Sequence, residues 1–113
     1  MEKKIFLTLL LCAFGLHAHA PKAIELGYDA ETATLSVKVL HKVSNQEKHY
    51  IKKIAVYKGD ELLTERTYEQ QETATSQEEI FLFIDEPLKK DDAVTVRAYC
   101  NIMGKKSADL KWE

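Results

Sequence analysis

The chain has 113 residues, of which 45% are hydrophobic and 30% are charged, and its formal net charge is −2. A chain of this length can form one domain with a single core and is too short for two. The small negative charge gives no indication of a nucleic acid or an anionic membrane as a partner, because both attract strongly basic surfaces.

The N-terminus has the pattern of a secretion signal. Lys3 and Lys4 precede an apolar run over residues 5–14, and small residues follow closely. This is the order of a cleavable signal peptide, and a run of about ten apolar residues is roughly half of what a membrane-spanning helix needs. We therefore predict that residues 1–20 are a signal peptide, that the protein is periplasmic or secreted, and that it has no transmembrane anchor.

The sequence leaves the position of the cut open. The small-x-small site Ala18-His19-Ala20 places Pro21 directly after the cleaved bond, where signal peptidases tolerate proline poorly. Cleavage after Ala18 is the rival, and it keeps His19 at the mature N-terminus. The mature domain is expected to span residues 21–113. Removal of the signal takes away two of the 16 basic and one of the 18 acidic residues, which leaves a formal charge of −3.

The number of cysteines limits the chemistry open to the mature domain. The chain has two cysteines, Cys12 and Cys100, and the first leaves with the signal. Cys100 is then alone, so the mature domain can form no intrachain disulfide. Such a residue has four possible roles: a small buried hydrophobe, a metal ligand, a reactive thiol or an intermolecular bridge.

Through the mature chain apolar residues alternate with a step of two, which is the period of half-buried strands. In chain order we predict seven strands near residues 23–28, 34–41, 50–58, 61–68, 79–85, 93–100 and 106–112. The side chains expected to point inward are Leu35, Val37 and Val39, then Ile54 and Val56, then Ile80, Leu82 and Ile84, and finally Val94, Val96, Ala98 and Cys100. Seven short strands without a helical segment predict an all-β fold, an immunoglobulin-like antiparallel sandwich.

Turn-forming residues separate these strands. Residues 29–31 follow the first strand, Lys58-Gly59-Asp60 forms a hairpin connection, residues 87–92 precede the sixth strand and residues 101–105 precede the last. The segment from Glu69 to Glu79 is rich in Gln, Glu, Thr and Ser, and we expect it to be an exposed loop.

Two segments stand out chemically. In the first, residues 41–51, His41 ends one strand and His49 opens the next; in the second, residues 100–104, Cys100 ends the sixth strand. The corresponding strand ends of a sandwich can share one rim, so two imidazoles and a thiolate could meet there. Imidazole with thiolate is a donor mix suited to iron, copper or zinc. A histidine taken alone is more often a surface residue than a metal ligand.

The sequence His49-Tyr50-Ile51, the Ile-Ala-Val that follows, and the run from Val94 through Cys100-Asn101 to Gly104 resemble the iron-binding domain of the desulfoferrodoxin and neelaredoxin (superoxide reductase) family. The resemblance extends from about Pro21 to Trp112. It implies an immunoglobulin-like sandwich that holds a square-pyramidal iron with four equatorial histidines and an axial cysteine thiolate. It also implies that the ferrous centre reduces superoxide to peroxide without making dioxygen.

Carried over to this chain, the resemblance assigns metal-ligand roles to His49, Cys100 and His41. His41 precedes His49 by eight residues where the family has six, so its match assumes a two-residue insertion. Met103 stands where the family has a further histidine. His19 can match the remaining one, provided that it survives processing. The ligand set is therefore expected to be incomplete.

Two interpretations remain. The first is an exported, superoxide-reductase-like redox protein that binds non-haem iron and offers an open coordination position to superoxide or another small redox substrate. The second is a β-sandwich interaction module without catalysis, metal-free or copper-binding, that contacts a periplasmic protein partner through a sheet face or edge. Copper enters because two histidines, a cysteine and the Met103 thioether are the donors of blue-copper sites.

Overall fold

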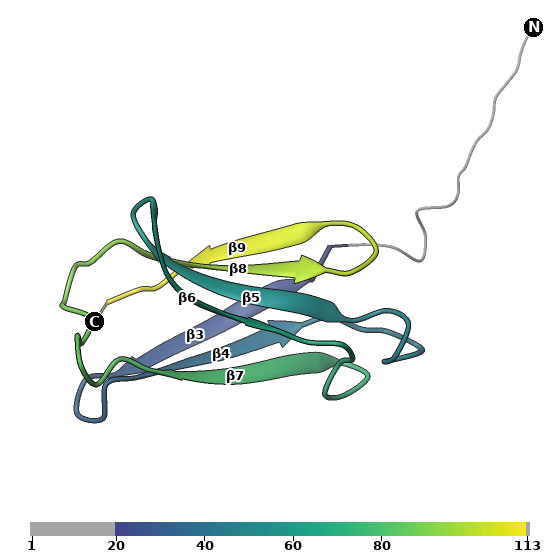
Figure 1. Cartoon of the computed structure of the whole chain (residues 1–113), viewed down its shortest axis with the longest axis horizontal. Helices are drawn as coiled ribbons and strands as arrows, with labels where there is room; N and C mark the ends of the chain where they lie inside the picture. Colours follow the sequence, from purple (N-terminus) through teal and green to yellow (C-terminus); the bar gives the residue numbers. More distant parts are fainter. Residues whose placement is uncertain (1–19, 113) are drawn as a thin grey trace, which may run out of the picture.

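The computed structural model describes residues 20–112, so residues 1–19 of the predicted signal peptide, His19 among them, lie outside the described residues. The strands are β3 (Ala23–Asp29), β4 (Thr34–Leu40), β5 (Ile51–Lys58), β6 (Glu61–Thr67), β7 (Ser76–Leu82), β8 (Val94–Cys100) and β9 (Lys105–Asp109). They form two antiparallel sheets, in the orders β3-β4-β7 and β6-β5-β8-β9, which face each other as two layers (Figure 1). The predicted seven-stranded all-β sandwich is confirmed. No helix in residues 20–112 is long and apolar enough to cross a membrane.

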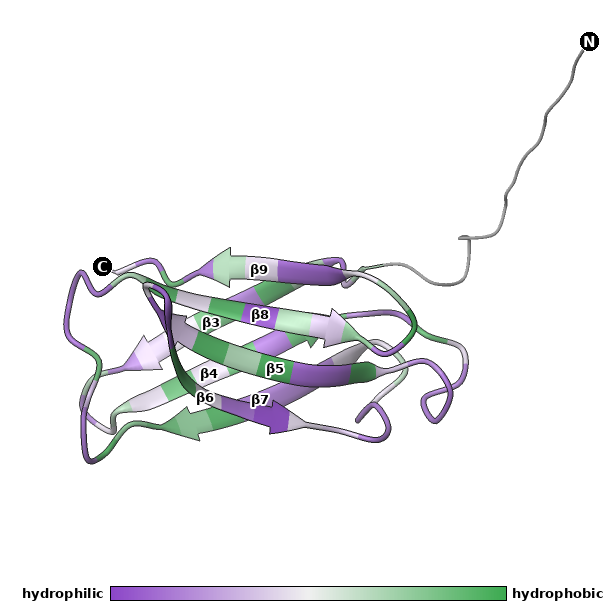
Figure 2. Ribbon diagram, turned by 45° about the horizontal axis from the view of Figure 1, so that its top comes forward, coloured by the Kyte–Doolittle hydropathy of each residue, from purple (hydrophilic) through white to green (hydrophobic). Residues whose placement is uncertain are grey.

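The core lies between the two sheets and is built from alternate residues of the central strands. Figure 2 shows the alternation along β8 as hydrophobic and hydrophilic bands. The inward positions predicted for β4, β5 and β8 are all buried, with exposed fractions of 3% or less: Leu35, Val37, Val39, Ile54, Val56, Val94, Val96, Ala98 and Cys100. Here the period of two identified the buried face correctly.

On β7 the prediction of the buried face was wrong. Ile80 and Leu82 are 50% and 61% exposed, and Ile84, just beyond the strand, is 67% exposed, whereas Phe81 is 2% exposed. Phe81 lies directly opposite Leu35 of β4, and directly opposite residues of an antiparallel pair point to the same face. The large buried ring of Phe81 therefore sets the parity of this strand.

The polar segment before β7 also differs from its prediction. β7 begins at Ser76, three residues earlier than expected, because the ladder with β4 continues to the pair Leu40 and Ser76. Gln71, Ser76 and Gln77 are buried, with exposed fractions of 1%, 5% and 6%, so residues 69–79 are only in part an exposed loop. β9 is shorter than predicted and ends at Asp109; the bounds of the other five strands lie within one residue of the prediction.

The strand directions give the sandwich two ends. At one, called here the site end, β4 and β8 finish and β5 and β9 begin; Ile51 at the start of β5 pairs with Cys100 at the end of β8. At the other, called the far end, β3 passes into β4, and the two are joined by the short turn after Asp29. The chain enters the described domain at the site end (Figure 1).

Candidate metal centre

His41 is fully enclosed at the site end. It follows β4, and its backbone N–H donates to the carbonyl of Thr75 at 2.9 Å, which extends the pairing of β4 by one residue. The side chain is 1% exposed. Its Nδ1 lies 2.8 Å from Oε1 of Gln71, so the ring is held by a buried side chain rather than by solvent.

Gln71 is bonded through both ends of its amide. Its Nε2 donates to the carbonyl of His41 at 2.7 Å and to that of Thr73 at 2.9 Å. Its Oε1 also accepts the backbone N–H of Ile51 at 3.2 Å. Sequence reasoning missed this residue, because a single glutamine in a run of polar residues carries no periodic signal of burial.

His49 is half-buried and comes from the loop between β4 and β5. Its backbone N–H donates to the carbonyl of Asn45 at 2.9 Å, within a turn. Asn101 fixes the residues on both sides of it: its Oδ1 accepts the N–H of Tyr50 at 2.8 Å, and its Nδ2 donates to the carbonyl of Lys48 at 3.0 Å. Asn101 thereby ties the histidine loop to the end of β8.

Cys100 is the last residue of β8 and its thiol forms no disulfide. The side chain is 3% exposed. The backbone N–H donates to the carbonyl of Gly104 at 3.0 Å, which closes a tight connection to β9. Gly104 has φ +94°, and a Cβ there would lie 2.8 Å from the Ala20 backbone, so only glycine allows the entering chain to pass this close to the turn after Cys100.

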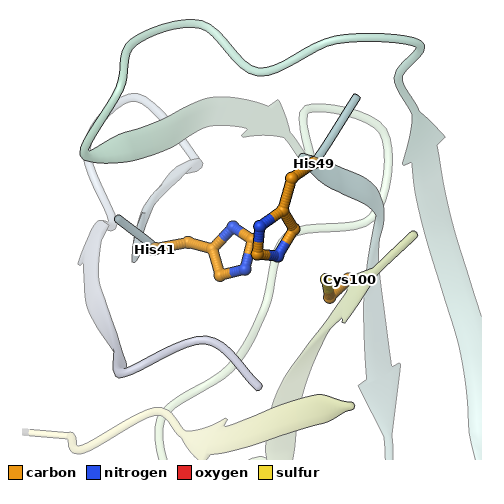
Figure 3. Close-up of side chains that lie close together, drawn as sticks. All are labelled: His41, His49 and Cys100. Carbon is orange, nitrogen blue, oxygen red and sulfur yellow. The ribbon is translucent and has the colours of Figure 1, made fainter. Parts of the chain in front are cut away.

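The three side chains converge, as Figure 3 shows. One donor atom each from His41, His49 and Cys100 lies within 4.8 Å of the others. The two imidazole rings meet edge to face, with centroids 4.7 Å apart and an interplanar angle of 89°. Donors of one ion with bonds of about 2.1 Å to nitrogen and 2.3 Å to sulfur lie no more than about 4.4 Å apart. The upper limit of 4.8 Å exceeds that value, so the three side chains must move closer together to bind one ion; imidazole and thiolate are donors that fit a transition metal.

The other two residues considered from the sequence differ in placement. Met103 lies in the turn between β8 and β9, and its side chain is 59% exposed. His19 lies outside the described residues. The residue that follows it, Ala20, contacts Gly104 in that same turn.

The outer face of β8, behind the cysteine, carries cations stacked on tyrosines. The Arg97 guanidinium lies 5.2 Å from the centroid of the Tyr57 ring, and Lys53 Nζ lies 4.7 Å from that of Tyr99. A hydrogen bond from Arg97 lowers the pKa of the Tyr99 hydroxyl, and the positive charge nearby acts in the same direction. These cations lie on the outward side of the sheet, opposite to the Cys100 side chain.

Together these features define a small antiparallel β-sandwich with a largely buried cluster of two histidines and a cysteine at one end. A sequence profile of desulfoferrodoxin matches residues 16–108, which is most of the chain. The chain belongs to the desulfoferrodoxin family.

Solved structures of similar fold agree with this architecture. A hypothetical protein, PH1083, from Pyrococcus horikoshii OT3 has a TM-score of 0.53 and 19% identity, with 81% of this chain and 89% of that chain covered. A superoxide reductase in the oxidised state has a TM-score of 0.50 and 20% identity, with 82% and 88% covered. A neelaredoxin from Ignicoccus hospitalis has a TM-score of 0.47 and 21% identity, with 84% and 81% covered. The agreement in architecture is drawn from the first two structures, and at these identities their likeness concerns the fold alone. No curated protein sequence matches the chain.

Proposed function

We propose that this protein is an exported, iron-binding redox protein of the superoxide reductase type, in which His41, His49 and Cys100 are metal ligands. The observation that carries the proposal is the convergence of these three donors, from three separate segments, within 4.8 Å of one another at one end of the sandwich. Family membership supports iron as the ion.

Iron is preferred to copper for a further reason. The copper reading depends on the Met103 thioether as a fourth donor, but that side chain is 59% exposed on its turn, whereas His41 and Cys100 are almost fully enclosed. Imidazole and thiolate are both suitable donors to iron. When bound, the ion supplies the single electron that superoxide reduction needs.

The chain's own residues would give that ion its surroundings. The Cys100 thiolate is a strong electron donor, and its burial beneath the turn to Gly104 limits access of water and oxidants to the sulfur. Both imidazoles would be neutral ligands; the Gln71 amide holds the His41 ring, and a hydrogen bond to the carbonyl of Asn45 fixes the His49 backbone. The Met103 side of the site, where the family has a histidine, lies at the surface and offers superoxide a route of approach.

We further propose that the ligand set is shorter than that of the family and that export leaves His19 on the mature chain. Met103, which stands where the family has a histidine, supports the shorter set. Pro21 supports the cut after Ala18, because signal peptidases tolerate proline poorly directly after the cleaved bond. The intact mass of protein recovered from the cell exterior or periplasm tests the cut. A mature chain that starts at Pro21 would remove His19 from any site.

The activity is tested by loading the protein anaerobically with ferrous iron and following the decay of superoxide. We expect each superoxide to take up one electron and two protons and to yield one hydrogen peroxide, with no dioxygen released, and the iron to become ferric. His49→Ala, which removes one imidazole from a half-buried loop, is the matched control and should lose this reaction. If the wild type takes up no iron, or consumes superoxide no faster than that variant, the non-catalytic interaction module becomes the better description.

A further inference from the structure

We propose that Gln71 is a positioning residue that holds His41 in the tautomer with its proton on Nδ1, so that Nε2 carries the lone pair offered to a metal. The assignment of the tautomer follows from the protein's hydrogen bonds. The role of this tautomer in metal binding rests on the proposed function.

The orientation of the Gln71 amide is fixed by three backbone groups. Its NH₂ group faces two carbonyl oxygens, those of His41 at 2.7 Å and Thr73 at 2.9 Å. Its oxygen faces the N–H of Ile51 at 3.2 Å. The flipped amide would place oxygen against both carbonyls and NH₂ against a backbone donor. Neither arrangement forms a hydrogen bond, so only one orientation satisfies this buried group.

That orientation decides the state of His41. The Gln71 oxygen lies 2.8 Å from His41 Nδ1, and an amide oxygen can only accept a hydrogen bond. Nδ1 must therefore donate, and in the neutral ring the lone pair is then on Nε2. With both side chains 1% exposed, no bulk water replaces the lost bond in the other tautomer. A buried hydrogen bond of this kind shifts the equilibrium by about tenfold.

Gln71 also connects the segments that meet at the site. The carbonyls of His41 and Thr73 and the N–H of Ile51 belong to the end of β4, the loop before β7 and the start of β5. Ile51 pairs with Cys100 across the sheet. One amide thus fixes the ring of one proposed ligand and the strand beside another, which is how partners of metal-bound histidines set ring orientation in general.

The test begins with the metal-free, ¹⁵N-labelled wild type. Long-range ¹H–¹⁵N correlation spectra report which imidazole nitrogen of each histidine bears the proton, and His41 is expected to be protonated at Nδ1 at neutral pH. This spectrum requires no variant. A His41 with its proton on Nε2 would overturn the inference.

Two variants then show that Gln71 is the cause. Gln71→Met keeps an unbranched side chain of similar length without the acceptor, and should reduce the Nδ1–H preference by about tenfold. Gln71→Glu keeps an oxygen at the same position and should retain the preference. Gln70→Met alters the exposed neighbour and should leave the His41 signals unchanged. An unaltered tautomer in folded Gln71→Met contradicts the proposal.

Metal titration gives a second, separate readout. With Co²⁺ as the probe, Gln71→Met should weaken binding about 10–100-fold relative to wild type and Gln70→Met. Equal affinities would contradict a positioning role. If the wild type binds no Co²⁺ or Fe²⁺ yet shows the Nδ1–H tautomer, the proposed function fails while the tautomer assignment stands, so the two failures are distinguishable.

Discussion

The two ends of the sandwich are closed by different chemistry. At the far end Trp112 packs edge to face on Tyr28, with ring centroids 5.6 Å apart. Their polar atoms are satisfied simply: the indole Nε1–H donates to the carbonyl of Asp92 at 2.8 Å, and the Tyr28 hydroxyl accepts the N–H of Leu88 at 3.1 Å. At the site end the corresponding position between the sheets is filled by two imidazoles, a thiol and a buried glutamine.

The difference indicates which end of the sandwich is shaped by function and which by stability. Aromatic rings at the far end bury apolar area at little cost in desolvation. A histidine that is 1% exposed and held by a glutamine that is 1% exposed requires every polar atom to be desolvated and rebonded, which yields little net stability. Leucines would close that end at least as well. The polar closure therefore indicates that the site end is shaped by function and the far end by stability.

The largest effect is expected at the cysteine. Cys100→Ser replaces a thiolate donor by a hydroxyl, which is a far weaker ligand for iron, and should abolish the thiolate-to-metal absorption band of the Fe³⁺- or Co²⁺-loaded protein. The metal-free variant should retain most of its stability in urea, because the two side chains are nearly equal in size.

Reactivity of the thiol provides the counter-test. Alkylating agents should modify Cys100 in the metal-free protein more slowly after Co²⁺ is added, since a coordinated sulfur is protected. A thiol that reacts equally fast with and without the ion would show that Cys100 is not a ligand.

A change at the far end should do the reverse. Trp112→Ala removes a half-buried ring and should lower the free energy of unfolding by about 2–3 kcal/mol, somewhat below the range for fully buried tryptophan. Metal affinity should remain that of the wild type. Urea denaturation and Co²⁺ titration of the same preparation measure both quantities, and a loss of affinity comparable with that of Cys100→Ser would remove the distinction between the two ends.

A gain of function at the site end is the next effect in size. Met103→His places an imidazole on the turn after Cys100, where the side chain is 59% exposed and has room. Imidazole is a better donor to iron than a thioether, so iron affinity should rise about tenfold or more, which corresponds to about 1.4 kcal/mol. Superoxide consumption should rise with it.

Ile102→His is the matched control for that gain. Ile102 is the neighbouring residue and is 50% exposed, but the family resemblance assigns no ligand to its position. Iron titration should leave Ile102→His at the wild-type affinity. No gain for Met103→His over this control would show that the site lacks more than the one imidazole.

The smallest effect concerns a polar contact that takes no part in closing either end. The Tyr68 hydroxyl donates to Oε1 of Glu79 at 2.6 Å, and burial, followed by this bond to a carboxylate, raises the pKa of Tyr68 above its ordinary value of 10.0. Above about pH 10 the unfolded chain loses a proton that the folded protein keeps, so stability should fall as the pH rises through this range. The loss is at most about 1.4 kcal/mol per pH unit, and less here because the residue is half-exposed.

Tyr68→Phe tests that pH dependence. Urea denaturation between pH 9 and pH 11 should give a shallower decline for the variant than for the wild type, with similar stabilities near pH 7 after allowance for the lost hydrogen bond. Parallel declines would mean that Tyr68 titrates as in the unfolded chain.

The strands that sequence alone predicts best are those in which only one parity is apolar. On β8 the residues Val94, Val96 and Ala98 alternate with polar ones, and the buried face follows directly. Between residues 80 and 84 both parities are apolar, since Phe81 alternates with Ile80 and Leu82. Only the register with β4 decides which of them is buried, and register is a property of the pair of strands rather than of one strand.

The residues of the site also differ in how far the sequence alone predicts them. His41, His49 and Cys100 are recognisable because imidazole and thiolate are scarce, chemically distinctive groups near strand ends and in a family motif. Gln71 has neither scarcity nor period, and its burial is a consequence of the His41 ring and of three backbone groups from different segments. Residues that orient ligands are thus visible only once the fold has brought those segments together.

X-ray absorption at the iron edge of the anaerobically loaded wild-type protein tests the metal centre most directly, because it counts the atoms bound to iron. The proposed centre predicts one sulfur and at least two imidazole nitrogens, with the sulfur absent from Cys100→Ser. A spectrum of oxygen and nitrogen donors alone, identical in wild type and variant, would contradict a metal centre at this end of the sandwich.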